Sequence, residues 1–544
     1  MQDLRDQLCL AIKDLYGLDF VPEFSPAPAN IAADYSSSAP LKLAKILHKS
    51  PMAIASELAA QLQDVEVSAP GFLNFILSDE YLAQNITSLS IDFSKNISSD
   101  EYSGQTVICE FSDPNPFKVL HVGHLYTSIV GDSISRLFEY AGARVIRANF
   151  GGDVGLHVAK TLYILEQSAL DDFTIDDIAK CYVEGTAAYE DDEKARAEIT
   201  ELNKEIYRIN QTDDHSTDLA KLYWRGRELS YQYFKDFYTN IGVHFDKFYP
   251  ESSVTDLGME KVSKELEEGV YEMSQGAVIF DGEKYGLHTR VFINKEGVPT
   301  YETKDVGLIF AKWQDYHFDK SVVITGSEQL EYMKVVLKSV EQYAPELVEK
   351  TTHLTHGLVK LPGNVKMSSR KGNFLKAVDV LGMVKSELQS AYDSSDDTVA
   401  LAATKYAFLR YRMGGNIIFD PKESVKMTGN SGPYLLYSAV RAKKILQKSS
   451  SLASSVAKYD AHERGLAKKI LEYKSVLAEA VAEMAPHKVA GYLYELAQEF
   501  SRFYENCPVV GNDKEVERTQ LVTSYLATIT HGLNILGIDI PEEM

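Results

Sequence analysis

The chain has 544 residues, of which 45% are hydrophobic and 25% charged, a composition typical of a globular protein with about three to four domains. Its 56 lysines and arginines face 78 aspartates and glutamates, which gives a formal net charge of −22. This balance argues against a protein held to nucleic acid by overall positive charge, although a local basic surface is compatible with it. The four cysteines are scattered without a CxxC pair, so we expect neither a disulfide framework nor a zinc ribbon.

The N-terminus and the hydropathy of the chain indicate a cytoplasmic protein. Asp3, Asp6 and Asp14 interrupt the first residues, unlike a signal or transit peptide. No apolar run approaches the ~20 residues that a membrane-spanning helix needs. We therefore expect reduced thiols, a cytoplasmic location and no membrane partner.

The first predicted domain is a small α+β unit over residues 1–97. Apolar residues near the N-terminus recur at helical spacing: Leu4, Leu8, Ile12 and Leu15. The mixed segment that they open runs to residues 71–78. The polar stretch from Ile91 to Gly104 is predicted to be a linker.

A strand, a helix and a second strand are predicted next. Residues 106–111 (TVICEF) form an apolar, β-rich run, and a helical pattern follows from Leu125 to Leu137 and stops near Gly142. Residues 143–150 (ARVIRANF) are then predicted to be the second strand. This order is a βαβ unit, which indicates a parallel sheet.

From about residue 165 to 270 the chain is acidic and helical, which is too long for a simple crossover and predicts an insertion. Strand character returns at residues 277–280, 289–293 and 321–326. We therefore expect a second, α/β domain over residues 98–392.

The last part of the chain, residues 393–544, is predicted to be an α-helical bundle. A polar break (DSSDD) at residues 393–397 opens it, and the Ser-rich residues 449–455 are predicted to be a helix-to-helix loop. Two apolar stripes at helical spacing are separated by Pro486. They consist of Leu466, Ile470, Tyr473, Leu477, Val481 and Met484, and of Val489, Leu493, Leu496, Phe500 and Phe503.

The strongest chemical signal is His121-Val122-Gly123-His124, between the first predicted strand of the sheet and its helix. A helix N-terminus offers unpaired N–H groups and the positive end of the helix dipole, which suit a triphosphate. Gly123 has no side chain, so a flat base could approach the backbone closely. The two histidines can donate hydrogen bonds to charge that develops on phosphate oxygens. The alternative is two surface histidines around a helix-starting glycine.

The second signal is KMSSRKGN at residues 366–373. Three cations (Lys366, Arg370 and Lys371) and two hydroxyls on a short glycine-containing loop could clamp a polyanion. Taken alone, the segment could equally be a solvated basic loop. Its combination with the histidine motif on an upstream βαβ unit favours phosphate binding.

This pair of motifs resembles the HIGH and KMSKS signatures of class I aminoacyl-tRNA synthetases. Further segments resemble the arginyl-tRNA synthetase branch of that class, in order along most of the chain: 71–75, 110–124, 300–307, 326–332, 356–373, 428–446 and 496–504. The resemblance implies a Rossmann-like parallel-sheet catalytic domain with a helical insertion. It also implies a small N-terminal domain that contacts tRNA and an all-α C-terminal bundle that binds the anticodon.

A pocket for L-arginine follows from the resemblance. A guanidinium is planar and permanently charged, and its five donors match carboxylates. Glu110 and Asp305 would face this group, with the Tyr301 hydroxyl as a further acceptor. Two carboxylates would discriminate against neutral side chains, and a shorter ammonium would leave acceptors unpaired. The alternatives are a helix N-cap for Asp305 and a plain core position for Tyr301.

At the other end of the same ligand, Asn115 and Gln329 would hold the α-amino and carboxylate groups of arginine. Ser112 and His121 complete the predicted arginine-binding set. All of these assignments are carried by the family resemblance and by the presence of each residue type in the matching segment.

The resemblance also implies a reaction in two steps. The arginine carboxylate attacks the α-phosphate of ATP and gives arginyl-adenylate and pyrophosphate; the terminal ribose 2′-OH of tRNA(Arg) then takes the arginyl group and AMP leaves. The implied catalytic residues are His121, His124, Lys366 and Lys371, with Mg²⁺ on the phosphates and no metal ligand from the protein. The implied ATP-binding residues are His121, Gly123, His124, Gly357, Lys366, Met367, Ser368 and Ser369. Members of the family usually need tRNA before the first step.

Contacts with tRNA are implied at both ends of the chain. Tyr434 and Tyr437 match positions where the family presents aromatic rings to anticodon bases, which stack on such rings. Arg441 adds local positive charge. Phe72 and Asn74 match residues that meet the outer corner of tRNA. The alternatives are core aromatic residues in the bundle and plain strand residues in the small domain.

The sequence departs from the family pattern at four positions. Ser369 replaces the second lysine of KMSKS, Tyr126 a usual arginine, His157 a common glutamine and Val119 a usual proline. None of these removes a principal ligand type. The alternatives to an active, monomeric arginyl-tRNA synthetase are a non-catalytic tRNA-binding paralogue, a synthetase for another amino acid and a small-molecule adenylyltransferase. The preferred isoacceptor and the role of the acidic insertion are open.

Overall fold

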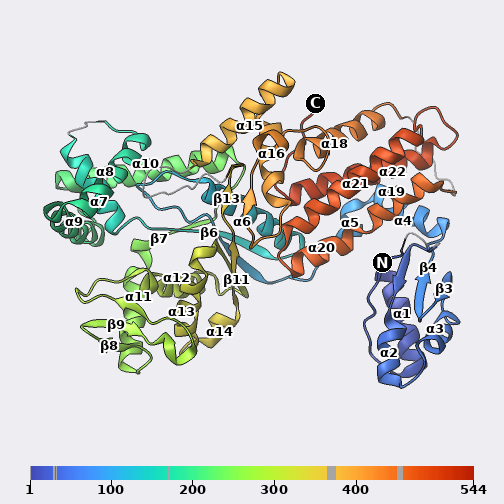
Figure 1. Cartoon of the computed structure of the whole chain (residues 1–544), viewed down its shortest axis with the longest axis horizontal. Coiled ribbons are helices and arrows are strands. Elements are labelled where there is room, and N and C mark those ends of the chain that lie inside the picture. The colour runs from blue at the N-terminus through green and yellow to red at the C-terminus, as the bar shows by residue number, and fades with distance from the viewer. Residues whose placement is uncertain (1, 29–30, 32, 169–171, 364–374, 450–457) are drawn as a thin grey trace.

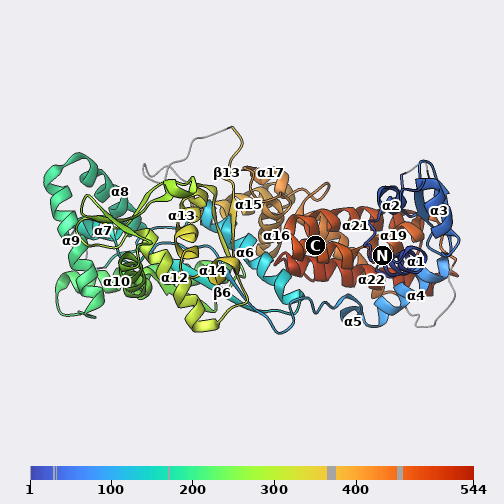
Figure 2. The same cartoon turned by 90° about the horizontal axis from the view of Figure 1, so that it is seen from below.

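The structure is a computed structural model that describes residues 2–28, 31, 33–168, 172–363, 375–449 and 458–544. The molecule is elongated, with a parallel sheet and a helical insertion toward one end, and a helical bundle and a small N-terminal domain toward the other (Figures 1 and 2). Among the helices described, none has both the length and the apolar composition needed to cross a membrane.

The N-terminal domain is the expected small α+β unit. Its antiparallel sheet has the order β1 (Ser25–Pro26), β2 (Tyr35–Ser37), β4 (Phe72–Phe75) and β3 (Val65–Ser68). Its helices are α1 (Gln2–Tyr16), α2 (Ala39–Leu47) and α3 (Pro51–Ala59). The predicted N-terminal helix is confirmed as α1, whose Leu8 and Ile12 are fully buried.

The predicted βαβ unit is confirmed. β5 (Thr106–Glu110) and β6 (Arg144–Gly151) pair in parallel, joined by α6 (Val122–Tyr140), which packs against both. The complete sheet adds β7 (Lys247–Pro250), β11 (Lys320–Gly326) and β12 (Thr351–His356), in the parallel order β12-β11-β5-β6-β7. The chain order reverses between β5 and β11, and ligands of open α/β sheets bind outside the carboxyl ends of the strands at such a point.

The helical insertion is shorter than expected. Its helices are α7 (Leu156–Gln167), α8 (Ile175–Asp191), α9 (Glu193–Gln211) and α10 (Asp218–Asn240). After residue 240 the chain returns to the main sheet as β7, and α11 (Glu251–Glu267) then packs on α12 (Tyr301–Tyr316). The expected end near residue 270 is therefore wrong. The four residues of β7 carry too short an apolar pattern to be separated from the helices around them.

A small antiparallel sheet precedes α12. It consists of β10 (Arg290–Ile293), β9 (Ala277–Phe280) and β8 (Glu272–Ser274), so the strands expected at 277–280 and 289–293 are confirmed. The remaining elements around the main sheet are η1 (Gly282–Tyr285), η2 (Ser327–Gln329), α13 (Leu330–Glu341), α14 (Pro345–Glu349), β13 (Val359–Lys360) and β14 (Ile417–Ile418).

The C-terminal part is helical, as predicted. Its helices are α15 (Ala377–Tyr392), α16 (Asp397–Leu409), α17 (Pro421–Ser424), α18 (Gly432–Leu446), α19 (Ala461–Leu471), α20 (Tyr473–Ala482), α21 (Pro486–Asn506) and α22 (Glu515–Ile535). Both predicted apolar stripes lie in the core, and Pro486 begins α21 where the pattern resets. Most of the expected Ser-rich loop at 449–455 lies outside the described residues.

The segment expected to be a linker is partly structured. It contains α5 (Phe93–Ile97), whose Phe93 ring stacks at 6.4 Å on Tyr473 and whose Ile97 is buried. The preceding α4 (Asp79–Ile91) packs along α22 and α19 of the bundle. The polar composition of this segment conceals the two apolar residues Phe93 and Ile97, of which Phe93 contacts the bundle at Tyr473.

Candidate active site

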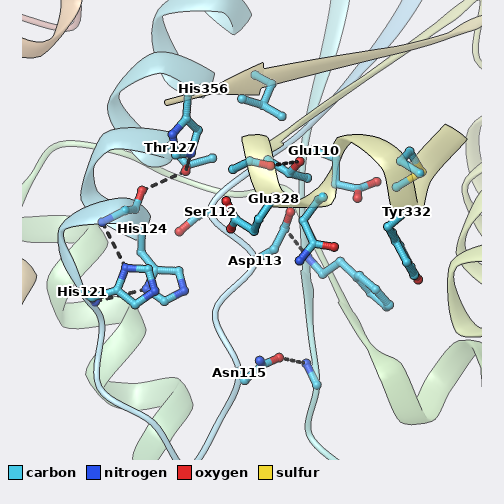
Figure 3. Close-up of a pocket in the computed structure, with 18 of the residues that line it drawn as sticks. Glu110, Ser112, Asp113, Asn115, His121, His124, Thr127, Glu328, Tyr332 and His356 are labelled. Atoms are coloured by element: carbon cyan, nitrogen blue, oxygen red, sulfur yellow. Dashed lines mark hydrogen bonds between the residues drawn. The ribbon is translucent and has the colours of Figure 1, made fainter. Parts of the chain in front are cut away.

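A cavity of about 1310 Å³ opens at the carboxyl ends of β5 and β11, where the strand order reverses. Its walls come from the residues after β5, the N-terminus of α6, the start of α12, η2 and the turn after β12. Figure 3 shows the two histidines of α6 on one side of the cavity and acidic side chains on the other.

The histidine motif builds the N-terminus of α6 by capping it. The Nδ1 atom of His121 accepts a hydrogen bond from the Gly123 N–H at 3.0 Å, and the Nδ1 atom of His124 accepts one from the His121 N–H at 3.1 Å. The two rings stack with centroids 3.9 Å apart. Because both Nδ1 atoms accept, the proton of each neutral ring is on Nε2.

Burial keeps both rings neutral at pH 7. It lowers the pKa of His121 to about 4, and it lowers the pKa of the enclosed His124 well below the usual range. Lys118, nearby on the preceding loop, lowers the pKa of both rings further. The pocket therefore presents imidazole Nε2–H groups that can donate to an anion without first being charged.

The segment that follows the KMSSRKGN motif lies beside the histidine motif. The Val122 N–H donates to the Leu375 carbonyl, the Ala377 N–H donates to the Leu120 carbonyl, and His121 forms a β-bridge with Lys376. The motif itself lies outside the described residues, and with it six residues singled out above: Lys366, Met367, Ser368, Ser369, Arg370 and Lys371. The described flank nevertheless returns the chain to the N-terminus of α6.

The opposite wall is acidic, and three of its carboxyl groups, those of Asp305, Asp113 and the exposed Glu328, lack an ion-pair partner among the described residues. Asp305 accepts a hydrogen bond from the Tyr332 hydroxyl, and Asp113 accepts one from the Phe150 N–H at 2.8 Å. Burial and the neighbouring Glu110 raise the pKa of Asp305 to about 8. Burial and the same neighbour raise the pKa of Asp113 well above its usual range. A pocket of this kind is suited to a cation.

Three further acidic side chains of this wall are already paired. Glu110 is 2.5 Å from Lys312 Nζ, and Glu251 is 2.6 Å from Lys304 Nζ, with all four side chains buried. Glu302 lies 3.2 Å from Arg290, which also lines the cavity. Glu110 thus enters the site as half of an ion pair, whereas the family resemblance implies that it faces a guanidinium directly.

The amide of Asn115 is oriented by the backbone of β6. The Gly152 N–H donates to Asn115 Oδ1 at 2.8 Å, so Nδ2 of the amide is left to donate into the cavity. A side chain at position 152 would lie 2.7 Å from Asn115 Oδ1 and 2.9 Å from Glu251 Oε1, so only glycine lets these two groups approach.

The remaining residues expected to bind arginine also line the cavity. Tyr301 is 55% exposed at the start of α12, and Gln329 is exposed at the end of η2. Ser112 is buried, and its hydroxyl bonds the Tyr238 and Ser128 hydroxyls at 2.9 Å each. Gly357 follows β12 beside the histidine motif.

Sequence reasoning missed several residues of this wall. Asp113 and Tyr332 lie within segments already singled out for their resemblance, so proximity to the motif was an available signal. Glu251 and Arg290 lie outside those segments, on α11 and β10, and no local pattern marks them. Only the packing of α11 on α12 brings Glu251 to the cavity.

A second candidate surface lies on the bundle. The Arg441 guanidinium lies over the rings of both Tyr437 and Tyr504, 4.6 Å and 4.5 Å from their centroids. Both rings are more than 40% exposed, so the stack is open to a planar partner. Tyr434, on the same helix, is partly buried and its hydroxyl lies 3.2 Å from that of Ser501. Tyr504 was not predicted, because its helix shows a regular apolar stripe on the other face.

Phe72 and Asn74, the two residues singled out in the N-terminal domain, differ in their exposure to solvent. Phe72 is partly exposed at the start of β4. Asn74 is 1% exposed; it accepts a hydrogen bond from Ser36 at 2.6 Å and donates one to Ser68 at 2.8 Å. Its amide therefore joins three strands of the sheet, which favours the plain strand role that was the alternative for Asn74.

Three of the four residues that depart from the family pattern, Tyr126, Val119 and His157, lie within the described structure, and all three are buried. Tyr126 is fully buried against the rings of His356 and Phe408, and Val119 is buried as well. His157 is buried, and its Nε2 donates to the Gly152 carbonyl at 2.7 Å. His157 thus supports the glycine that orients Asn115.

Family models match three successive parts of the chain. Residues 86–407, more than half of its length, match the model for tRNA synthetases class I (R), catalytic domain. Residues 2–77 match the arginyl tRNA synthetase N terminal domain, and residues 435–544 match the DALR anticodon binding domain.

Similar proteins cover nearly the whole chain. The arginine–tRNA ligases of Clostridium perfringens and Bdellovibrio bacteriovorus are 27% and 29% identical to it; the alignments cover 92% of this chain and 93% and 91% of those proteins. The arginyl-tRNA synthetase structure from Thermus thermophilus is 24% identical with a TM-score of 0.81, and both chains are covered completely. The one from Plasmodium falciparum is 18% identical with a TM-score of 0.77, covering 100% of this chain and 99% of that one.

Proposed function

The chain belongs to the class I arginyl-tRNA synthetase family, whose catalytic-domain model matches more than half of it, and from this membership we infer that it attaches L-arginine to tRNA at the expense of ATP. One observation in the site supports this inference: an acidic wall that suits a cation faces the N-terminus of helix α6, which suits a phosphate. The two walls match the two halves of an arginyl-adenylate, a guanidinium at one end and a nucleotide phosphate at the other.

At the acidic wall, we propose that Asp305 and Asp113 receive the arginine guanidinium. Both carboxyl groups are partly buried and have no ion-pair partner among the described residues, so a permanent cation would relieve their mutual repulsion. Glu110, held by Lys312, and the Tyr301 hydroxyl complete this end of the ligand site. The oriented Asn115 amide and the exposed Gln329 bind the carboxylate and α-amino end, near Ser112 and His121.

At the nucleotide wall, His121 and His124 donate from Nε2 to phosphate oxygens as the arginine carboxylate attacks the α-phosphorus and pyrophosphate leaves. Gly123 and Gly357 line the nucleotide end of the pocket. The remaining ATP ligands proposed from the resemblance are Lys366, Met367, Ser368, Ser369 and Lys371, which lie outside the described residues. The 2′-OH of the tRNA then attacks the arginyl carbonyl and AMP is released.

Mg²⁺ is proposed to enter on the phosphates of ATP. Among the described residues, the one group of three potential ligands close enough to share an ion is Asp460, Glu463 and Cys507, which lies in the bundle. Glu463 there is already paired with Arg518 and Lys514. The pocket thus offers no ready protein cage, and octahedral Mg²⁺ commonly keeps phosphate and water ligands.

For tRNA(Arg), we propose two contact surfaces. The Tyr437–Arg441–Tyr504 stack, with Tyr434 beside it, receives unstacked anticodon bases, and Phe72 meets the outer part of the tRNA. Asn74 supports the strand that carries Phe72. The proposed boundaries are 1–97 for the tRNA-contacting domain, 98–392 for the catalytic domain and 393–544 for the anticodon-binding domain. A cytoplasmic monomer is proposed from the family habit.

The experiment is pyrophosphate exchange into ATP with each of the twenty amino acids, with and without total tRNA. Exchange with arginine alone, dependent on tRNA, is the expected result. Exchange with another amino acid would overturn the assignment of the acidic wall. Binding of tRNA with no exchange at all would favour the non-catalytic paralogue.

A further inference from the structure

His356, the last residue of β12, links two elements across the nucleotide end of the pocket. Its Nε2 atom lies 2.6 Å from the Thr127 hydroxyl of α6, and its Nδ1 atom lies 2.8 Å from the Gly357 carbonyl. The Thr127 hydroxyl is also 2.8 Å from the Gly123 carbonyl. A chain of polar atoms therefore runs from Gly123 through Thr127 and His356 to Gly357, as Figure 3 shows for its labelled members.

Both ends of this chain are glycines that line the cavity, and both are proposed above to meet ATP. The turn at Gly357 packs directly against the backbone of Gly415 and Asn416, because a Cβ at position 357 would lie 2.2 Å from the Gly415 carbonyl. Backbone packing therefore determines the position of the cavity surface at Gly357. The position of the opposite surface, at Gly123, relative to Gly357 depends on the hydrogen bonds through His356.

The imidazole is held in one orientation by its surroundings. It is 6% exposed, and the ring of Tyr126 meets it edge to face, with centroids 4.8 Å apart. Burial lowers the pKa of His356, so the ring is neutral at pH 7 and donates from Nδ1 to the Gly357 carbonyl. Its Nε2 atom accepts from the Thr127 hydroxyl, whose single proton is shared with the Gly123 carbonyl one helical turn away in α6. The Tyr126 ring thus supports this histidine.

We propose that His356 is a positioning residue that holds the Gly123 and Gly357 walls at the separation required for the adenosine part of ATP. The inference rests on the proposed function, because it assumes that these two glycines receive the nucleotide. His356 acts through Thr127 and Gly357 and itself takes no part in the reaction. A positioning role of this kind affects the affinity for ATP and spares the affinity for arginine, whose acidic wall lies across the cavity.

The test uses the full chain and two single variants. His356→Phe keeps an aromatic ring against Tyr126 and removes both hydrogen bonds, and Thr127→Val removes the hydroxyl without changing the shape of the side chain. We expect each to raise the KM for ATP in arginine-dependent exchange by about tenfold and to leave the KM for arginine within about twofold. The double variant should be no worse than either single variant, because all three break the same bridge.

The matched control is His531→Phe in the bundle. His531 also bonds a hydroxyl, that of Tyr473 at 2.7 Å, but it lies outside the pocket. This variant should change neither KM. If His356→Phe does not fold, His356→Asn, which keeps a donor near the Gly357 carbonyl, replaces it and should show a smaller rise in the KM for ATP than Thr127→Val.

Equal changes in the two KM values, an unchanged KM for ATP, or multiplying effects in the double variant would overturn the inference. Calorimetric titration with ATP separates this failure from failure of the proposed function. If the wild-type chain binds ATP but shows no exchange, the function is wrong while the ratio of Kd values between wild type and His356→Phe still decides the role of His356. Absence of ATP binding by the wild type would overturn both.

Discussion

At the scale of single residues, the acidic wall owes its character to which carboxyl groups are left without a cation. Three of its glutamates pair with Lys312, Lys304 and Arg290, and those pairs are neutral overall. Asp305 and Asp113 have no such partner among the described residues, and their pKa values are raised by burial and by Glu110. Without a ligand, the raised pKa values favour protonated Asp305 and Asp113; a bound guanidinium would favour the ionised carboxylates.

Asp305→Asn tests this assignment with almost no change of shape. The amide cannot match the charge of the guanidinium and places a donor against its donors, so we expect arginine-dependent exchange to fall by at least about 100-fold, equivalent to about 2.7 kcal/mol. The affinity for tRNA, measured by filter retention, should stay within about twofold. Unchanged kinetics with arginine would remove Asp305 from the ligand site.

The raised pKa of Asp305 also predicts a coupling between arginine and protons. With a pKa of about 8 in the empty pocket, Asp305 is mostly protonated at pH 7, whereas the bound guanidinium requires it ionised. Arginine binding should therefore release a proton, and the affinity should rise with pH up to about pH 8 and then level off. Calorimetry at pH 7 in two buffers of different ionisation enthalpy measures the release. Heats that do not depend on the buffer, in the wild type, would contradict the prediction.

At the scale of elements, the pocket depends on how closely α11 and α12 cross. A Cβ at Gly258 of α11 would lie 2.1 Å from the Thr303 carbonyl, and one at Gly307 of α12 would lie 2.1 Å from the Val254 carbonyl. The two backbones are thus in direct contact at these glycines. Because Glu251 begins α11 and Asp305 lies one turn into α12, this contact determines the position of both acids.

Gly307→Ala should separate these helices. We expect a loss of about 1–3 kcal/mol in the free energy of unfolding, typical of overpacking, and a larger rise in the KM for arginine than in the KM for ATP. Denaturant unfolding and exchange kinetics measure the two effects. The matched control is Gly382→Ala in α15, where an added Cβ meets nothing within 4 Å; there we expect a gain of about 0.5–1 kcal/mol and normal kinetics. A Gly307→Ala variant as stable and as active as that control would refute the crossing argument.

At the scale of the whole molecule, a buried carboxylate attaches the N-terminal domain to the bundle. Asp34 is 8% exposed and pairs with Arg464 and Lys468 of α19, and Arg464 also bonds Asp79 and the Leu77 carbonyl. Figure 1 shows the small domain beside this end of the bundle. The two proposed tRNA surfaces therefore lie on parts joined through one cluster of charges.

Asp34→Asn should loosen this attachment, because it leaves Arg464 and Lys468 without their buried carboxylate. We expect faster proteolytic release of the N-terminal domain and weaker tRNA binding, with the KM values for arginine and ATP unchanged. Asp19→Asn is the control, since Asp19 forms an exposed pair with Lys13 at 2.8 Å and such pairs contribute little. Protease resistance equal to that of the control would count against the attachment.

The pKa of Asp34 is shifted in the opposite direction to that of Asp305, although both effects strengthen as the pH rises. Hydrogen bonds and ion pairs with Lys468, Leu77 and Arg464 outweigh burial and lower the pKa of Asp34 below its usual 3.8. Its contribution to docking is therefore complete above about pH 4 and is lost as the pH falls toward the lowered pKa.

Much of this protein was determined by the sequence itself, because the relevant signals are local. The βαβ unit around residues 106–150, the apolar stripes of α19 to α22 and the histidine cap of α6 all depend on neighbours a few residues apart. The position of the pocket follows too, since parallel strands place the loops after them at one edge of the sheet. The same locality explains the errors, because short β7 and the two apolar residues of α5 show no period of their own.

Tertiary structure alone decided which groups in the pocket are free to act. Lys312 neutralises Glu110 from 202 residues away, Glu251 arrives with α11, and His356 reaches Thr127 across 229 positions. It also turned Asn74 inward and placed Tyr504 against Arg441. Such pairings depend on distance and burial in the folded chain. Charge interactions fall off over a few ångströms and grow as water is excluded, and no pattern along the chain encodes either quantity.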